Sequence, residues 1–119
     1  MKILLVEDSN VSIKLMQLIL QEAECNYDIA KDAISAMELY FSNDYDVVFI
    51  DLGLPDIDGL SIAKIMLTYN KHKYTKSDIY ALTAHTNKTC KQACLASGMK
   101  GFIPKPIEIN EIQKIICKI

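Results

Sequence analysis

Ionisable side chains directly follow several short apolar runs of this sequence. Glu7 and Asp8 follow the first run, and Asp51 follows the third. Thr83 ends the fourth run, and Lys105 lies between two prolines just after the fifth. If these runs are parallel strands of one sheet, their carboxyl ends meet at one edge, where such sheets bind ligands. The spacing therefore predicts a cluster of three carboxylates, one hydroxyl and one ammonium group.

Such a cluster has a defined chemistry. Crowded carboxylates repel one another, and some of their pKa values must rise unless a cation lies among them. Hard oxygen ligands with room for water suit Mg²⁺. With a divalent cation bound, Asp51 could accept a phosphoryl group as an acyl phosphate, and Lys105 could bind the phosphoryl oxygens. No histidine or cysteine base stands at these strand ends, so acyl-transfer hydrolysis fits poorly. No glycine-rich phosphate loop follows the first strand.

Each residue of the cluster also has a purely structural interpretation. Paired acids after a strand often cap the next helix, and an aspartate near a proline is often a turn residue. A lysine between prolines is often a solvated loop residue, and Thr83 alone carries no signal. It is the placement of all of them at strand ends that favours a functional site. His72 and His85 are expected to be exposed to solvent.

Apolar runs alternate with amphipathic stretches along the whole chain, without a repeat or a linker. Runs that do not alternate in polarity are typical of parallel strands covered on both faces. Asp32 and Asp58 supply helix start signals, and Gly98 supplies a stop signal. This order, repeated five times, predicts a doubly wound α/β sandwich. We expect strands at 3–6, 27–30, 47–50, 79–83 and 101–103, and helices near 10–24, 32–42, 59–70, 86–97 and 107–118.

Length and composition limit the class of protein. The 119 residues are enough for one domain, 1–119, with its own core. The net charge is −2 and all 13 basic residues are lysine, which argues against nucleic-acid binding. No apolar run approaches the roughly 18 residues of a membrane span, and no signal peptide is evident, so a cytoplasmic location is expected. The four cysteines form no CxxC pair and are expected to be unmodified thiols: Cys25, Cys90, Cys94 and Cys117.

The motifs resemble those of the receiver domains of two-component response regulators. The resemblance covers Lys2 to about Lys118 and is carried by Leu5–Asp8, Asp51–Gly59, Leu82–Ala84 and Phe102–Pro106. It implies the family's flavodoxin-like (βα)5 sandwich of three layers, with a parallel five-stranded sheet in the order 2-1-3-4-5.

The resemblance also implies roles for the clustered residues. Asp51 would be the phosphoacceptor, and Lys105 would bind a phosphoryl oxygen. Mg²⁺ would be held by Asp8 directly, by Glu7 through water, by Asp51, and by the backbone carbonyl of Gly53.

The resemblance further implies residues that change conformation on phosphorylation and residues that set the lifetime of the phosphoryl group. Thr83 would hydrogen-bond to the phosphoryl group and Phe102 would follow it inward, so that the two act as a switch. The Lys105–Pro106 bond is expected to be cis. Gly53 and His85 occupy the positions that tune how long the phosphoryl group survives in this family.

The function implied is that of a phosphoacceptor signalling domain. It would take a phosphoryl group from a phosphohistidine on a histidine kinase or a histidine-phosphotransfer protein, and it would catalyse its own phosphorylation and dephosphorylation without being a conventional enzyme. It could be a free-standing regulator or, more in keeping with its motifs, the receiver of a hybrid histidine kinase, with a phosphorylation-dependent dimer possible.

Three alternatives stay open at this point. A degenerate receiver that only binds a partner would be expected to have lost Asp51, Asp8 or Lys105. A haloacid-dehalogenase-type phosphatase needs a second aspartate where Gly53 stands. A flavin carrier of the flavodoxin type is disfavoured by acids where it needs a phosphate loop.

The helix expected at 10–24 has an unusually wide apolar arc. Its core face is expected to consist of Ser12, Met16, Ile19, Leu20 and Ala23. Val11, Leu15 and Leu18 extend the arc along one edge beyond the ~100° that a surface helix needs for its own core. Either this edge is buried against the last helix, or it is a docking edge for a helical partner that carries phosphohistidine.

Overall fold

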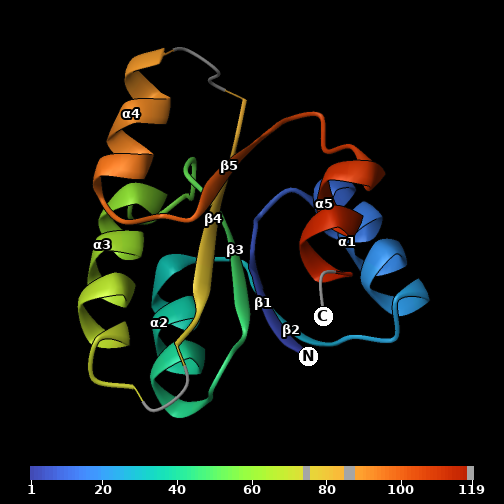
Figure 1. Ribbon diagram of the computed structural model, residues 1–119, viewed down its shortest axis with the longest axis horizontal. Coiled ribbons are helices and arrows are strands. Elements are labelled where there is room, and N and C mark those ends of the chain that lie inside the picture. The colour runs from blue at the N-terminus through green and yellow to red at the C-terminus, as the bar shows by residue number, and fades with distance from the viewer. Residues whose placement is uncertain (74–75, 85–87, 118–119) are drawn as a thin grey trace.

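The computed structural model describes residues 1–73, 76–84 and 88–117. Five parallel strands form one sheet in the order β2-β1-β3-β4-β5, and a helix follows each strand (Figure 1). The strands are β1 (Lys2–Val6), β2 (Asn26–Ala30), β3 (Val47–Asp51), β4 (Asp78–Thr83) and β5 (Gly101–Pro104). The helices are α1 (Asn10–Glu22), α2 (Ala33–Ser42), α3 (Gly59–Asn70), α4 (Lys88–Ala96) and α5 (Ile109–Ile116). The predicted fold class and strand order are confirmed, and no helix in the described part of the chain combines the length and apolar character of a membrane crossing.

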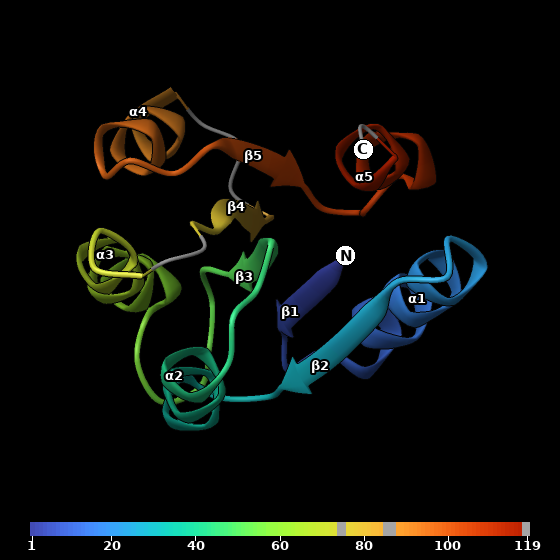
Figure 2. The same ribbon diagram turned by 60° about the horizontal axis from the view of Figure 1, so that its bottom comes forward.

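The helices cover both faces of the sheet, as the continuous apolar strands predict. Helices α1 and α5 lie on one face, and α2, α3 and α4 lie on the other (Figure 2). Residues of β1 alternate between the two cores: Ile3 and Leu5 pack with α1 and α5, whereas Leu4 and Val6 pack with α2 and α3. Each face of the sheet therefore has its own buried core.

Short polar signals fix where the helices begin and end. The Asp32 carboxylate accepts a hydrogen bond from the Ser35 amide at 2.8 Å, and Asp58 accepts one from the Ser61 amide at 3.0 Å. Gly98 has a φ of +98°, a left-handed conformation that favours glycine after the end of α4. These three predicted signals are confirmed. Helices α2 and α3 end at the expected residues, whereas α1, α4 and α5 end one or two residues earlier than expected.

The core face of α1 differs from the expected one. Ile13 is buried, whereas Ser12 and Ala23 are only half-buried. Val11 is 82% exposed and Leu18 is 61% exposed, so the apolar edge of this helix faces solvent. Val11 and Leu18 are therefore not buried against α5, so the interpretation that the whole edge is buried there is wrong.

Candidate functional site

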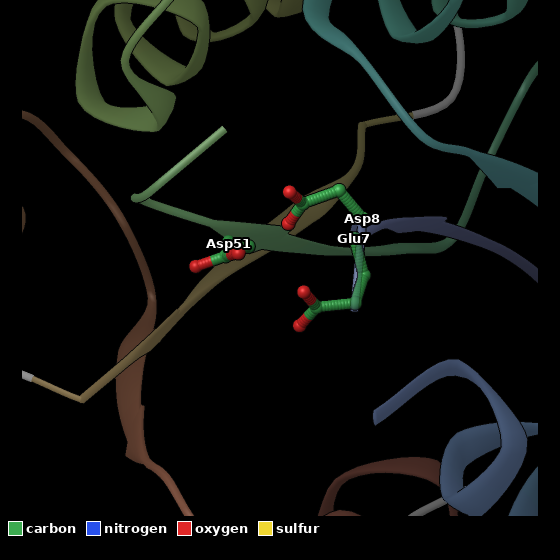
Figure 3. Close-up of side chains that lie close together, drawn as sticks. All are labelled: Glu7, Asp8 and Asp51. Atoms are coloured by element: carbon green, nitrogen blue, oxygen red, sulfur yellow. The ribbon is translucent and has the colours of Figure 1, made fainter. Parts of the chain in front are cut away.

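The three acidic residues of the predicted cluster lie together at the carboxyl edge of the sheet. Glu7 and Asp8 follow β1, and Asp51 is the last residue of β3 (Figure 3). One carboxylate oxygen from each lies within 4.8 Å of those of the other two. Glu7 is fully buried, Asp51 is 7% exposed and Asp8 is exposed. The site thus consists of two buried carboxylates and a third carboxylate that is exposed to solvent.

Lys105 joins this cluster from the end of β5. Its Nζ lies 2.7 Å from Glu7 Oε2 and 3.4 Å from Asp51 Oδ2. Its backbone amide donates to the Thr83 carbonyl at 2.8 Å, which extends the β4–β5 pairing to the site. The Lys105–Pro106 bond is cis, as expected. A single ammonium group therefore faces three carboxylates.

Burial shifts the pKa values of Glu7 and Lys105 in opposite directions. Burial raises the pKa of Glu7 and so does nearby Asp51, while Lys105 and the Ser9 amide act against this rise. Burial alone would lower the pKa of Lys105, but its ion pairs with Glu7 and Asp51 outweigh burial and raise it. Lys105 is therefore firmly cationic, and the carboxylates around it still carry excess negative charge.

Backbone contacts hold the Asp51 carboxylate in place. Its Oδ1 accepts a hydrogen bond from the Gly53 amide at 3.0 Å, and the Leu52 amide donates to the Leu82 carbonyl at 3.1 Å. Gly59 begins α3 so close to this strand end that a Cβ there would overlap the Asp51 carbonyl oxygen. A glycine at this position lets α3 begin close to the end of β3, next to Asp51.

The donor set fits a hard divalent cation. All three clustered side chains offer carboxylate oxygens, and the cluster contains no sulfur or imidazole ligand. Lys105 leaves two negative charges of the cluster unbalanced, which is the electrostatic condition for binding Mg²⁺. Glu7, Asp8 and Asp51 are the side chains that would hold it.

The predicted switch residues lie on neighbouring strands beside the cluster. Thr83, at the end of β4, is buried. Phe102 on β5 is half-buried against the core beneath α4, and the Lys91 ammonium lies 5.4 Å from the centroid of its ring. Sequence reasoning did not find this contact with Lys91, because it joins a helix to a strand. His85, the second residue expected to tune lifetime, lies outside the described residues.

Gly53 leaves open space beside Asp51. A Cβ built on Gly53 would meet Asp51 Oδ1 at 3.7 Å, which is an ordinary contact. A side chain could therefore be accommodated here, next to the acyl phosphate that the resemblance implies.

Asp56 lies in the loop that follows β3 and has a structural role that sequence reasoning missed. Its carboxylate accepts hydrogen bonds from the Ala33 amide at 2.9 Å and the Ile34 amide at 3.3 Å. These bonds lower the pKa of Asp56 and tie the loop that follows β3 to the first turn of α2. The signal was present, because an acid is favourable at a helix start, but Asp56 is distant in sequence from the helix that it caps.

The fold and the acidic site define a class of doubly wound α/β proteins with a carboxylate cluster at the carboxyl edge, and comparison with known proteins identifies the family. The profile of the response regulator receiver domain matches residues 3–117. The chain belongs to this family and is a receiver domain of the two-component phosphorelay type.

Curated relatives are much longer than this chain. Hybrid signal transduction histidine kinase L of Dictyostelium discoideum is 33% identical over 98% of this chain, which spans 7% of that protein. The aerobic respiration control sensor protein ArcB of Escherichia coli is 30% identical over 99% of the chain, which spans 15% of it.

Solved structures show the same fold. The co-crystal structure of the Saccharomyces cerevisiae phosphotransfer protein Ypd1 and the Ssk1 receiver domain matches with a TM-score of 0.89 and 25% identity, covering 98% of this chain and 86% of that one. The receiver domain of sensor histidine kinase PA1611 from Pseudomonas aeruginosa, with a magnesium ion coordinated in its active site cleft, matches with a TM-score of 0.81 and 28% identity. That match covers 97% of this chain and 93% of the other.

Proposed function

We propose that residues 1–119 act as one receiver domain in which Asp51 accepts a phosphoryl group from a phosphohistidine. The observation that carries this proposal is the convergence of Glu7, Asp8, Asp51 and Lys105 at one sheet edge, with Lys105 bridging two of the acids. None of the residues whose loss would mark a degenerate receiver is missing. A phosphorylation-independent binding module therefore stays only as an outcome of the test below.

The chain's own residues can carry out the transfer. A carboxylate oxygen of Asp51 forms a bond to phosphorus while the phosphorus–nitrogen bond of the donor breaks, and the imidazole keeps the electron pair. Lys105 neutralises a phosphoryl oxygen, and the Gly53 amide holds the other Asp51 oxygen in place. Asp8, Asp51 and the Gly53 carbonyl would hold Mg²⁺ directly and Glu7 would hold it through water, and the ion would supply positive charge for the phosphoryl oxygens.

Intact mass after incubation with acetyl phosphate tests this proposal. We expect wild type to gain one phosphoryl group when Mg²⁺ is present and to gain none with a chelator, because the acids then lack their counter-ion. Asp51→Asn should gain none, whereas Asp56→Asn, an acid-to-amide change in the same loop, should gain one. Asp8→Ala should need much more Mg²⁺, since a carboxylate ligand is lost.

Two outcomes of that experiment contradict the assignment. Equal mass gain in wild type and Asp51→Asn would place the phosphoryl group elsewhere. No gain in wild type from any donor would favour the degenerate receiver.

The exposed edge of α1 supports a histidine kinase or histidine-phosphotransfer domain as the partner. α1 begins two residues after Asp8, and Val11 and Leu18 expose their side chains along it. Leu15 and Leu18 also line a shallow groove of about 120 Å³ that reaches Ile109 of α5. An apolar helix face of the donor could lie on this edge and present its phosphohistidine to Asp51. The co-crystal of Ypd1 with the Ssk1 receiver shows that a related receiver binds such a protein.

Substitutions on α1 separate docking from chemistry. Val11→Asp and Leu18→Asp should slow transfer from a phosphohistidine donor protein tenfold or more, about 1.4 kcal/mol. Phosphorylation by acetyl phosphate should stay normal, because a small donor needs no docking edge. Leu95→Asp is the control, because Leu95 on α4 is 56% exposed and thus similar in exposure to Leu18. Unchanged transfer rates in folded Val11→Asp and Leu18→Asp would remove α1 from the interface.

Gly53 is proposed to lengthen the life of the phosphorylated state. It has no side chain to orient an attacking water, and the space beside Asp51 Oδ1 can hold one. Gly53→Asn should therefore lose its phosphoryl group faster than wild type, as followed by intact mass after removal of the donor. An equal or longer lifetime in Gly53→Asn would contradict this role and leave His85 as the candidate.

Thr83 is proposed to couple the phosphoryl group to Phe102 and the face of α4, β5 and α5. Thr83→Ala should still be phosphorylated, because Asp51 and Lys105 are intact, but amide shifts near Phe102 should change less on phosphorylation. Identical shifts in both proteins would exclude Thr83 as the coupler. The same face is where a phosphorylation-dependent dimer would form, which sedimentation of the phosphorylated protein would detect.

A further inference from the structure

An apolar surface that plays no part in phosphorylation lies at the far ends of α2 and α3. Phe41 and Tyr69 are the next-to-last residues of these helices, and their ring centroids are 4.6 Å apart. They nevertheless stay 42% and 40% exposed, and Ile65, one turn before Tyr69, is 44% exposed. We call Phe41, Ile65 and Tyr69 the α2–α3 surface. Because each helix runs back across the sheet, this surface lies near the edge opposite Asp51 (Figure 1).

These apolar side chains share one hollow and are not scattered singly. The hollow has a volume of about 400 Å³ and is lined by Phe41, Lys64, Ile65, Thr68, Tyr69 and His72. Isolated exposed apolar residues are ordinary, but a contiguous apolar patch with a polar rim marks a binding surface. Two aromatic rings that already contact one another lose little freedom on binding a third group.

The rim of the hollow is basic. Lys64 and His72 are among its lining residues, and none of the described residues that line it is acidic. The Lys73 ammonium lies 5.8 Å from the Tyr69 ring centroid, is fixed there by hydrogen bonds to the Tyr40 and Asn43 carbonyls, and has Asp44 as a nearby acid that favours its charged form. A carboxylate-bearing partner therefore matches this rim, whereas a basic partner does not.

The described residues that line the hollow come from α2, from α3 and, in the case of His72, from the turn that follows α3, and none of them belongs to a strand. An extended peptide that pairs with a sheet edge would find no backbone partner in it, whereas a helix can seat apolar side chains between two helices. We propose that the α2–α3 surface binds an acidic amphipathic helix, which inserts apolar side chains beside Phe41 and Tyr69 and directs carboxylates to Lys64 and His72. Such a partner can bind while α1 and the phosphorylation edge stay free, so this inference goes beyond the proposed function.

A pair of designed peptides tests the proposal. The probe is an amphipathic helix of about 18 residues with leucines on one face and glutamates flanking them, and its counterpart has lysine at every glutamate position. Amide shifts of the full chain report where each peptide binds. We expect the acidic peptide to shift residues around Phe41, Ile65 and Tyr69, and to bind at least tenfold more tightly than the basic one.

Matched variants locate the binding. Phe41→Ser and Lys64→Glu should each weaken binding of the acidic peptide tenfold or more. Ile34→Ser, an exposed apolar position in the first turn of α2, and Lys100→Glu should leave it unchanged. All four variants should gain a phosphoryl group from acetyl phosphate as wild type does, which shows that they fold. If Phe41→Ser does not fold, Lys64→Glu at the exposed rim carries the test alone.

Three results would overturn the proposal. Equal binding of both peptides would show unspecific apolar adhesion, and no binding of the acidic peptide would show that the surface takes no such helix. Self-association of the chain that is lost in Phe41→Ser would assign the surface to a second copy of the chain.

Discussion

At the amino-terminal ends of the strands, the buried Tyr45 hydroxyl donates to Asp28 Oδ2 at 2.6 Å, and the Ser77 hydroxyl donates to the Tyr45 carbonyl. At the carboxyl ends, buried Glu7 and Asp51 share a single ammonium group with exposed Asp8 nearby. Both edges bury polar side chains of the same sheet. At the amino edge these groups satisfy each other, whereas at the carboxyl edge negative charge is left over.

This contrast between the two edges indicates which of them binds a ligand. A buried polar group that is fully paired contributes to the fold, and its neighbours have nothing further to offer. A cluster with surplus charge of one sign costs stability unless something from outside supplies the opposite charge. The surplus negative charge at the carboxyl edge therefore favours a cation there, whereas the paired groups at the amino edge do not.

Removal of Lys105 should have the largest effect on stability. Lys105→Met leaves the fully buried Glu7 carboxylate without its 2.7 Å partner and should destabilise the Mg²⁺-free protein by about 3 kcal/mol. Adding Glu7→Gln to this variant should recover much of the loss, because no buried charge is then left unpaired. Urea unfolding of the two single variants and the double variant measures the coupling, and strictly additive losses would contradict the ion pair.

At the amino edge, Tyr45→Phe should cost about 1.5 kcal/mol, because the hydrogen bond that the buried hydroxyl donates to the charged Asp28 is lost. Burial and the nearby Asp28 both raise the pKa of Tyr45, so its hydroxyl stays protonated and donates at any ordinary pH. Tyr27→Phe is the control, since the Tyr27 hydroxyl accepts its hydrogen bond from Gln21 at an exposed site. If both variants lost the same small amount of stability in urea, the amino edge would not be the paired network described here.

Acid-to-amide changes at the two edges should have opposite signs. Asp51→Asn should stabilise the Mg²⁺-free protein by about 1 kcal/mol, because it removes surplus negative charge. Substitution of a residue that serves function at a cost in stability often stabilises a protein. Asp28→Asn should destabilise it, because Tyr45 then donates to a neutral acceptor. Addition of Mg²⁺ should stabilise wild type more than Asp51→Asn in thermal unfolding. Destabilisation by both substitutions in the absence of Mg²⁺ would refute the surplus of charge at the carboxyl edge.

Asp58 also lies near the carboxyl edge, but hydrogen bonds from Ser61 satisfy its carboxylate. Its hydrogen bonds with the Ser61 hydroxyl and amide lower its pKa below the usual 3.8. A lowered pKa in the folded state gives stability that is present above the unfolded value and is lost as pH falls through the folded value. Asp58→Ala should therefore cost about 0.5–1 kcal/mol at neutral pH and almost nothing in strong acid.

Glu108 provides the control for that titration. It precedes α5 but makes no capping hydrogen bond through its side chain, so Glu108→Ala should show no comparable pH-dependent loss. Urea midpoints measured between neutral and acid pH compare the two variants. A pH-independent loss in Asp58→Ala would show that the charged cap is not what stabilises α3.

Much of the fold followed from local signals. The fold could be predicted from signals that each act within a few residues of the chain. These signals are the continuous apolar runs, the caps Asp32 and Asp58, and the stop at Gly98. The candidate site also followed, since a parallel sheet brings the residues after its strands to one edge wherever they lie in the sequence.

The rest depended on tertiary contacts that no local pattern contains. The apolar arc of α1 did not reveal that Ile13 is buried where Ser12 was expected, because adjacent helix positions differ by about 100° and the arc covered both. Its width was equally compatible with the exposure or the burial of Val11 and Leu18. The contact of Lys91 with Phe102 and the cap that Asp56 provides to α2 join distant segments, so only the structure shows them.

The identity of the phosphoacceptor is tested most directly by chemical trapping. Borohydride reduces an aspartyl phosphate to homoserine, so peptide mass mapping of the protein after acetyl phosphate, Mg²⁺ and borohydride reads out which carboxylate was modified. We predict homoserine at position 51 in wild type, none there without Mg²⁺, and none anywhere in Asp51→Asn. Homoserine at position 8 or 56, or an unmodified Asp51 in a protein that has gained the mass of a phosphoryl group, would contradict the account.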